Sequence, residues 1–267
     1  MSKINQAIHE IHYMDEMAER GTGLCRIHPL AKVVVTVWYI VTVMSFGKYE
    51  LSGLAAMILY PASLMILDEL SIRRAFRQLR AILFIVCMVG IANPFIDRDI
   101  LFYIAQVPVT GGAVSMLTLV LKAMLAVFAS YLLISTTSVE DICFALRMLH
   151  VPRILVTLLM LIYRYIILML KEAERVTQAY ALRAPDEKGI HYKVWGTLAG
   201  QMLLRSMDRA QLVYESMTLR GFNGEFYLKS RYKNRRKSIL YTVGWCAALT
   251  AFRIFPLFET AGGMMGL

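Results

Sequence analysis

The amino-acid sequence predicts an all-α integral membrane protein with about five transmembrane helices and a cytoplasmic domain of long amphipathic helices. Hydrophobic residues make up 58% of the 267 residues. The mean hydropathy is +0.54, which is too apolar for an ordinary soluble domain. Several apolar runs approach the roughly 20 residues that a helix needs to cross a bilayer. The net charge of +10 is unevenly distributed, because residues 136–237 hold 17 Lys and Arg against 9 Asp and Glu.

Five apolar runs are candidate transmembrane helices, and basic residues indicate the side on which each loop lies. The candidate runs cover residues 30–46, 51–67, 81–96, 112–135 and 238–255. Asn93-Pro94 interrupts the third run. Cytoplasmic loops carry an excess of Lys and Arg, so we expect residues 136–237 inside the cell, as well as the cluster Arg73, Arg74, Arg77 and Arg80. Residues 97–111 are then expected to form an outer loop.

These features divide the chain into four expected parts. Residues 1–29 form a cytoplasmic N-terminal segment, residues 30–135 a four-span membrane domain, residues 136–237 the cytoplasmic domain, and residues 238–267 a final transmembrane helix with a tail. We expect no cleaved signal peptide, because the N-terminal segment contains acidic residues and no apolar core. The protein is expected in the inner membrane, with its N-terminus and its basic domain in the cytoplasm.

One further apolar run, residues 154–170, is expected not to span the membrane. Arg164 lies at its centre, and inserting this charge would cost about 2.5–3.5 kcal/mol. If the run spanned alone, the basic residues that flank it would lie on opposite sides of the membrane, against the positive-inside rule. An interfacial or partner-facing helix keeps both flanks inside.

The basic domain is predicted to be helical. Ser138, with Asp141 three residues later, resembles a capping box and begins a short helix that ends at Leu149. Residues 153–184 contain no Gly or Pro, so they can form one helix of about 48 Å. Apolar residues at three- and four-residue steps predict another long helix over residues 193–220.

Each of the two long helices is predicted to end at a Leu-Arg pair. Leu182-Arg183-Ala184 precedes Pro185, which lacks an N–H group and cannot continue a helix. Leu219-Arg220-Gly221 ends in glycine, the residue that most easily forms a left-handed C-terminal cap. Two guanidinium groups are therefore expected at two helix ends. They would contact a soluble partner, unless they serve only as helix-dipole contacts or reach lipid headgroups.

The sequence lacks the short motifs of the common enzyme classes. It contains no Walker A sequence, no GxSxG, no HExxH and no CxxC. We therefore predict no catalytic residues, no cofactor and no ATP hydrolysis by this chain. No metal site is predicted either, because His9 with His12, and Cys25 with His28, are isolated pairs without further ligands. Nucleic-acid binding is not expected, since the basic helices also carry a broad apolar face.

Two polar residues, Lys122 and Asn93, fall within predicted spans. A charge in mid-membrane normally faces protein or a water-filled cavity, and it can mark a functional site. For Lys122 we favour a structural role, in which the ammonium group contacts a backbone carbonyl or a carboxylate at a helix–helix or subunit interface. A single lysine does not make a catalytic set.

With the Leu-Arg pairs placed at helix ends, the chain resembles the T component of energy-coupling factor (ECF) transporters. The resemblance covers nearly the whole chain, and its most specific stretch is Tyr214-Glu215-Ser216-Met217-Thr218-Leu219-Arg220-Gly221-Phe222-Asn223-Gly224. Other matching stretches are His28-Pro29-Leu30-Ala31-Lys32, Ser135-Thr136-Thr137, Tyr163-Arg164-Tyr165, Glu172-Ala173 and Arg205-Ser206-Met207-Asp208-Arg209-Ala210. The N-terminal half looks most like the cobalt-transport branch, CbiQ.

The resemblance implies that Arg183 and Arg220 couple this chain to two ABC-type ATPase subunits, as a homodimer or a heterodimer. In that family the coupling triplet is similar to Ala-Arg-Gly. Here Leu182 and Leu219 take the first place, and Ala184 takes the third place in one copy. Residues expected to support the coupling helices are Arg164, Glu172, Arg205, Asp208, Arg209 and Glu215.

The resemblance also implies that a separate membrane protein, the S component, binds the substrate, with or without a small accessory membrane subunit. This chain would be a non-catalytic subunit of an ATP-dependent importer in the lipid bilayer, most closely one that takes up Co²⁺ for cobalamin supply. Nickel or a vitamin is the alternative substrate. A stand-alone secondary transporter, which would need polar residues that converge at mid-membrane, and a membrane scaffold are alternatives of other classes.

Overall fold

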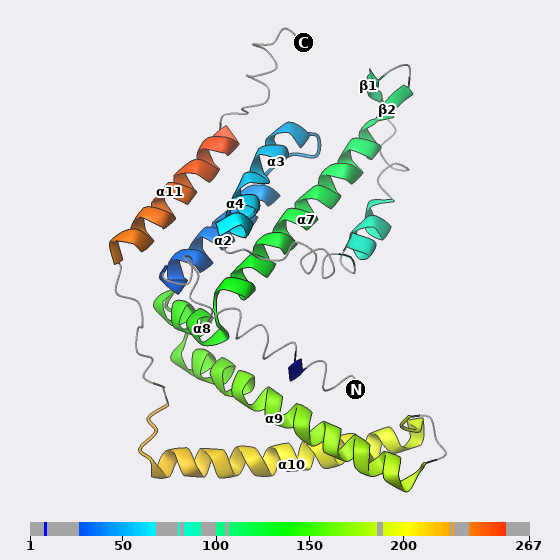
Figure 1. Ribbon diagram of the computed structural model, residues 1–267, viewed down its shortest axis with the longest axis vertical. Coiled ribbons are helices and arrows are strands. Elements are labelled where there is room, and N and C mark those ends of the chain that lie inside the picture. The colour runs from blue at the N-terminus through cyan, green and yellow to red at the C-terminus, as the bar shows by residue number, and fades with distance from the viewer. Residues whose placement is uncertain are drawn as a thin grey trace. The chain divides into compact units, whose positions relative to one another are not determined.

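The computed structural model describes residues 8–9, 27–67, 80, 83–91, 100–104, 107–185, 189–224, 226 and 235–254. Several predicted features lie outside the described residues, namely Arg73, Arg74, Arg77, Asn93-Pro94 and much of residues 1–29. The chain forms two compact units. One unit contains α2, α3, α4, α7 and α11, and the other contains α8, α9 and α10 (Figure 1).

The first unit is a helical bundle with a buried apolar core. Its helices are α2 (Pro29–Met44), α3 (Leu51–Met57), α4 (Leu59–Leu67), α7 (Gly111–Thr136) and α11 (Arg235–Ile254). α2 packs against both α7 and α11, as Figure 1 shows. The largest side chains that are fully buried in this core include Tyr39, Leu54, Met57, Leu132 and Leu249. The predicted first, fourth and last spans thus form helices at nearly the expected positions.

The predicted second span is interrupted, because α3 ends at Met57 and α4 begins at Leu59. Pro61 explains the break, since a proline has no N–H to donate to the carbonyl of the residue four positions earlier. That carbonyl belongs to Met57, and it accepts a hydrogen bond of 3.0 Å from the buried Tyr39 hydroxyl instead. A side chain of α2 therefore satisfies the backbone group that the proline leaves unpaired.

Basic side chains bind the chain segment that follows α2. Lys122 of α7 donates from Nζ to the carbonyl oxygen of Phe46, which is the kind of contact that the sequence favoured for this lysine. Arg253 of α11 donates to the Ser45 carbonyl at 3.2 Å and to the Glu50 carboxylate at 3.0 Å. Two helices therefore hold one short connection through charged hydrogen bonds.

The beginning of α2 and the end of α7 are also held by polar contacts. His28 caps α2, since its Nδ1 accepts from the Leu30 N–H at 3.2 Å and Pro29 occupies the first helical position. Lys32, of which only 5% is exposed, donates from Nζ to the Thr136 carbonyl at 2.6 Å. This bond satisfies one of the carbonyl groups that a helix leaves unpaired at its C-terminus.

The region between α4 and α7 contains the one departure from the predicted all-α class within the described residues. Residues 83–90 are helical, within the expected third span. The expected outer loop contains an antiparallel hairpin of β1 (Ile100–Ile104) and β2 (Val107–Thr110). These strands are rich in β-branched and aromatic residues, which favour extended structure.

Two of the described helices, α7 and α9 (Arg153–Arg183), are long and apolar enough to cross a membrane. α2 has 16 residues and is shorter than a typical span. The predicted number of five spans therefore stays a prediction. The same holds for the expectation that residues 154–170 do not span, because α9 meets the criterion of length and composition.

The second unit contains the two long helices that the sequence predicted. α8 spans Val139–Met148, α9 spans Arg153–Arg183 and α10 spans Tyr192–Leu219, each within two residues of its predicted bounds. Cys143 of α8 is buried, and this burial, with a smaller effect from Glu140, raises the pKa of its thiol. The thiol therefore stays protonated and packs as a small apolar group.

Candidate functional site

The candidate site is the pair of helices α9 and α10. α10 runs back across α9 after a short connection, as Figure 1 shows. Arg183 lies at the end of α9 next to this connection, whereas Arg220 lies at the far end of α10. α10 has 28 residues, and at 1.5 Å per residue its two ends are about 42 Å apart. The two arginines therefore lie at opposite ends of the pair.

The end of α9 exposes the first Leu-Arg pair. Ala184 is the C-cap residue, with φ −131° and ψ 69°, and its N–H donates to the Tyr180 carbonyl. Pro185 follows, as predicted. Leu182 is 85% exposed and Arg183 is exposed as well. An isolated chain gains almost nothing from a leucine in this position, since burial is the source of its stabilising effect.

The end of α10 exposes the second Leu-Arg pair through a left-handed turn. Gly221 has φ +78°. Its N–H donates to the Thr218 carbonyl, and the Phe222 N–H donates to the Met217 carbonyl, both at 3.0 Å. These two bonds form a Schellman motif, which confirms the left-handed cap predicted for this glycine. Leu219 is 89% exposed.

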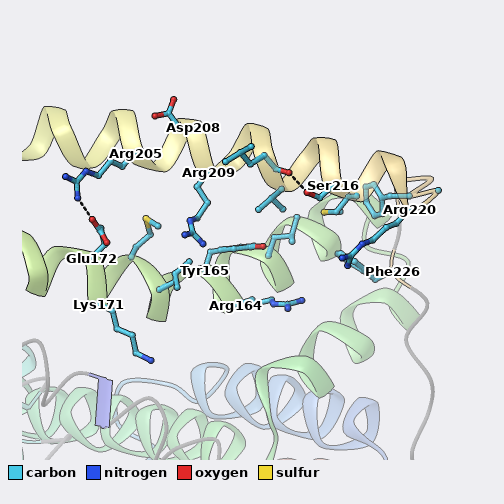
Figure 2. A pocket seen from close by; sticks show the side chains of 18 of the residues that line it. Arg164, Tyr165, Lys171, Glu172, Arg205, Asp208, Arg209, Ser216, Arg220 and Phe226 are labelled. Atoms are coloured by element: carbon cyan, nitrogen blue, oxygen red, sulfur yellow. Dashed lines mark hydrogen bonds and ion pairs between the residues drawn. The ribbon is translucent and has the colours of Figure 1, made fainter.

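A cavity of about 1030 Å³ lies between α9 and α10 (Figure 2). Five of the six predicted supporting residues line it, together with Arg220 and Gly221: Arg164, Glu172, Arg205, Asp208 and Arg209. The structure thus brings together residues that are far apart in the sequence. The sixth, Glu215, does not line this cavity, and neither does the triplet that contains Arg183.

One ion pair joins the two helices across the cavity. Arg205 of α10 donates from Nη1 to the Glu172 carboxylate of α9, and a dashed line marks this contact in Figure 2. Arg175 approaches the same carboxylate at 3.5 Å. Arg209 points from α10 toward α9, whereas Asp208 points away from the gap. Both residues of this ion pair were predicted from the sequence to support the coupling helices, but their contact was not predicted.

An apolar groove of about 500 Å³ adjoins the cavity. It is lined by side chains of both helices, among them Leu158, Ile162, Val213 and Tyr214. Several of these are exposed, including Ile162 at 60% and Tyr214 at 65%. Among the residues of α9, only Val156 and Thr157 are buried, and α10 has no buried residue.

Two contacts that the sequence did not reveal hold the segment after α10. Arg147 of α8 donates from Nη1 to the Phe226 carbonyl at 2.8 Å. The Thr157 hydroxyl of α9 donates to the Gly224 carbonyl at 3.4 Å. In the sequence, these contacts were indicated only indirectly, by the stretch from Gly221 to Gly224 that is part of the family resemblance. These contacts position the turn that presents Arg220.

Apolar helices, two of which are long and apolar enough to cross a membrane, are typical of a membrane protein. The match to a family model identifies its family. The chain belongs to the CbiQ cobalt transport protein family, whose model matches residues 23–233. This finding confirms the resemblance that the sequence indicated.

Curated relatives give the same result at lower coverage. A nickel permease, LarQ of Lactiplantibacillus plantarum, is 30% identical over 34% of this chain and 33% of its own length. A putative fused cobalt transport protein, CbiMQ of Methanocorpusculum labreanum, is 28% identical over 43% of this chain and 20% of its own length. An uncharacterized protein of Methanocaldococcus jannaschii is 28% identical over 48% of this chain and 49% of its own length. The matches thus span half or less of the length of these relatives.

Proposed function

We propose that this chain is the T component of an ECF-type importer, the membrane subunit that transmits the movement of two ABC-type ATPases to a substrate-binding S component. The observation that carries the proposal is the pair of exposed Leu-Arg ends. Leu182 and Leu219 are 85% and 89% exposed, and each stands beside an exposed arginine at the end of a long helix. Membership of the cobalt transport family supports this role.

The spacing of the two arginines suits two partner molecules. Because the ends of α10 are about 42 Å apart, Arg183 and Arg220 can enter grooves on two different ATPase subunits. Each guanidinium can donate several hydrogen bonds in a fixed fork to carboxylates or carbonyls. Each adjacent leucine would gain about 1.5–3 kcal/mol if an apolar groove buried it fully.

The helices can transmit movement because they are long and continuous. α9 is an uninterrupted helix of 31 residues, so a displacement of its Arg183 end is carried along the whole rod. ATP-driven closure of the ATPases would bring their grooves together and change the angle between α9 and α10. The first half of α9 would then reorient or release the S component, with or without a small accessory membrane subunit.

We propose Co²⁺ as the transported ion, for cobalamin supply, on the basis of the family description. The similarity to a nickel permease makes Ni²⁺ the second candidate, and a vitamin is the third. In this proposal the S component recognises the substrate. Uptake of radiolabelled Co²⁺ and Ni²⁺ by cells that express the complete complex distinguishes the two ions, because only the true substrate is depleted from the medium.

The double substitution Arg183→Ala with Arg220→Ala tests the coupling role. Loss of one partner of a buried charged contact typically costs about 2–5 kcal/mol. We therefore expect the double variant to lose co-purification with the ATPases and to lose transport. A helix-dipole or headgroup contact would cost only about 0.3–1 kcal/mol, and the complex would then survive.

Lys193→Ala with Arg175→Ala is the matched control, because both side chains are exposed cations of the same helix pair outside the triplets. This control should co-purify with the ATPases normally. Normal co-purification and transport by the Arg183/Arg220 variant would refute the coupling role. Uptake by the reconstituted chain alone would support the stand-alone secondary transporter instead, and ATPase binding without any transport would support the membrane scaffold.

A further inference from the structure

The cavity between α9 and α10 contains more positive than negative charge. Glu172 interacts with both Arg205 and Arg175, so its charge is already shared. Asp208 points away from the gap in Figure 2. Within the described part of the chain, Arg164 and Arg209 have no ion-pair partner. The residues that line the cavity include six cations (Arg164, Lys171, Arg175, Arg205, Arg209 and Arg220) and only two carboxylates (Glu172 and Asp208). The positive charge of Arg164 and Arg209, which lie on facing helices, is therefore not compensated by an ion pair.

The cavity continues directly into the apolar groove. Several residues line both spaces, among them Leu161, Tyr165, Arg209 and Val213. Arg209 thus stands at the junction, with charge on one side and an almost wholly apolar lining on the other. An occupant of both spaces must be anionic at one end and apolar along the rest.

We propose that this composite site binds one anionic phospholipid. The phosphate lies in the cavity and accepts hydrogen bonds from Arg164 and Arg209, and an acyl chain lies in the groove beside Leu158 and Val213. Arginine suits this role, because its planar fork matches the oxygen atoms of a phosphate. The inference does not require ATPase coupling, because the test uses no ATPase and because Leu182, Arg183 and Leu219 do not line the site. Arg220, the other coupling arginine, does line the cavity.

A phospholipid fits the site better than a soluble anion does. A free phosphate would satisfy the arginines but would leave the groove of about 500 Å³ exposed to water. A neutral lipid would fill the groove but would leave the two guanidinium groups without a partner. Basic pockets beside membrane helices favour anionic headgroups for the same electrostatic reason.

Native mass spectrometry of the full chain in detergent, titrated with phosphatidylglycerol, phosphatidylcholine or inorganic phosphate, tests the proposal without any ATPase. We expect one phosphatidylglycerol to bind, and phosphatidylcholine to bind much more weakly. A basic residue near an anionic lipid contributes about 1 kcal/mol, or roughly fivefold in affinity. Arg164→Gln with Arg209→Gln should therefore weaken phosphatidylglycerol binding by roughly 25-fold.

Two further variants make the result specific. Lys48→Gln with Lys193→Gln removes two exposed cations outside the cavity and should bind phosphatidylglycerol as the unmodified chain does. Arg164→Lys with Arg209→Lys keeps both charges but loses the planar forks, so it should bind phosphatidylglycerol more tightly than the glutamine variant and more weakly than the unmodified chain. That result shows that the glutamine variant fails through lost charge rather than through misfolding.

Four outcomes would overturn the proposal. The first is equal binding of phosphatidylcholine, and the second is full binding by the glutamine variant. The third is displacement of the lipid by equimolar inorganic phosphate, which would indicate a site for a free anion. The fourth is a chain that binds no lipid and in which Arg164 and Arg209 become protected from chemical modification only after the ATPases are added or the chain dimerises. That result would assign the surface to a protein partner.

Discussion

The bundle that contains α2, α7 and α11 and the pair formed by α9 and α10 are both apolar, but they use their apolar residues differently. In the bundle, large side chains such as Tyr39, Leu54 and Leu132 are at most 1% exposed. In α10, no residue is buried, and leucines such as Leu204 remain 63% exposed. The bundle has an internal core and exposes other apolar side chains, such as Ile66 and Leu240, on its outside, whereas the helix pair has almost no core of its own.

Apolar side chains therefore have two roles in this chain: some form an internal core, and others form a surface that other molecules can cover. Proteins that expose large apolar patches normally use them to contact partners or membranes. Tertiary packing supplies most of the stability of a helix, so α10 depends on whatever covers it. In the proposals above, the ATPases, the S component and a phospholipid would cover this pair.

Replacing one leucine by alanine in the bundle and one in the helix pair should give the largest difference in the free energy of unfolding. Leu132→Ala removes a side chain of α7 that is 1% exposed, and it should destabilise the chain by about 2–5 kcal/mol through the cavity that it leaves. Leu204→Ala should change stability by no more than about 0.5 kcal/mol. Unfolding of the purified chain in mild detergent measures both. Equal losses would mean that the helix pair has a core of its own.

Replacing glycine by alanine at two positions of the helix pair should change the stability of α10 in opposite directions. Gly221 has φ +78°, and Gly221→Ala should cost about 1–2 kcal/mol, because a side chain disfavours the left-handed conformation. Gly200 lies inside α10, so Gly200→Ala should stabilise the helix by about 0.5–1 kcal/mol. A Cβ atom at either position meets nothing within 4 Å, so the backbone alone accounts for each effect.

Hydrogen exchange of the α10 amide groups measures both glycine substitutions. Gly221→Ala should speed exchange in the last turn of α10, and Gly200→Ala should slow exchange in its middle. Faster exchange in both variants would show that α10 is held by a contact that alanine disturbs, and the contrast between a packed bundle and an uncovered helix pair would weaken.

The helix bounds could be predicted from the sequence because local residues set them. Pro185 ends α9, and Gly221 provides the left-handed turn after α10. The break between α3 and α4 has a local cause in Pro61, but the hydrogen bond that compensates it comes from Tyr39 on another helix. No periodicity in the sequence carries that information.

The candidate site was predictable as a list of residues but not as an arrangement. Arg164, Glu172, Arg205 and Arg209 were all named from the family resemblance, yet nothing in the sequence showed that they share a cavity. The relative register of α9 and α10 decides which side chains face each other, and it depends on how the two helices cross. The hairpin at residues 100–110 was missed because residues 97–111 were interpreted only as an outer loop, although both strands are rich in β-branched and aromatic residues.

The smallest expected effect concerns the ion pair that joins α9 to α10. Glu172 and Arg205 retain side-chain exposures of 22% and 54%, so water screens their attraction. A double-mutant cycle with Glu172→Gln and Arg205→Gln should give a coupling free energy of about 0.2–1 kcal/mol, which decreases at high salt.

The matched control is the same cycle with Arg175→Gln in place of Arg205→Gln. Arg175 lies on the same helix as Glu172, its Nη1 is 3.5 Å from the Glu172 carboxylate, and 78% of its side chain is exposed. Its coupling free energy with Glu172 should therefore be smaller. Thermal unfolding of the four variants at low and high salt measures each cycle. A coupling above about 2 kcal/mol, insensitive to salt, would mean that the two helices are bound to each other as firmly as the bundle, and that the pair does not rely on partners.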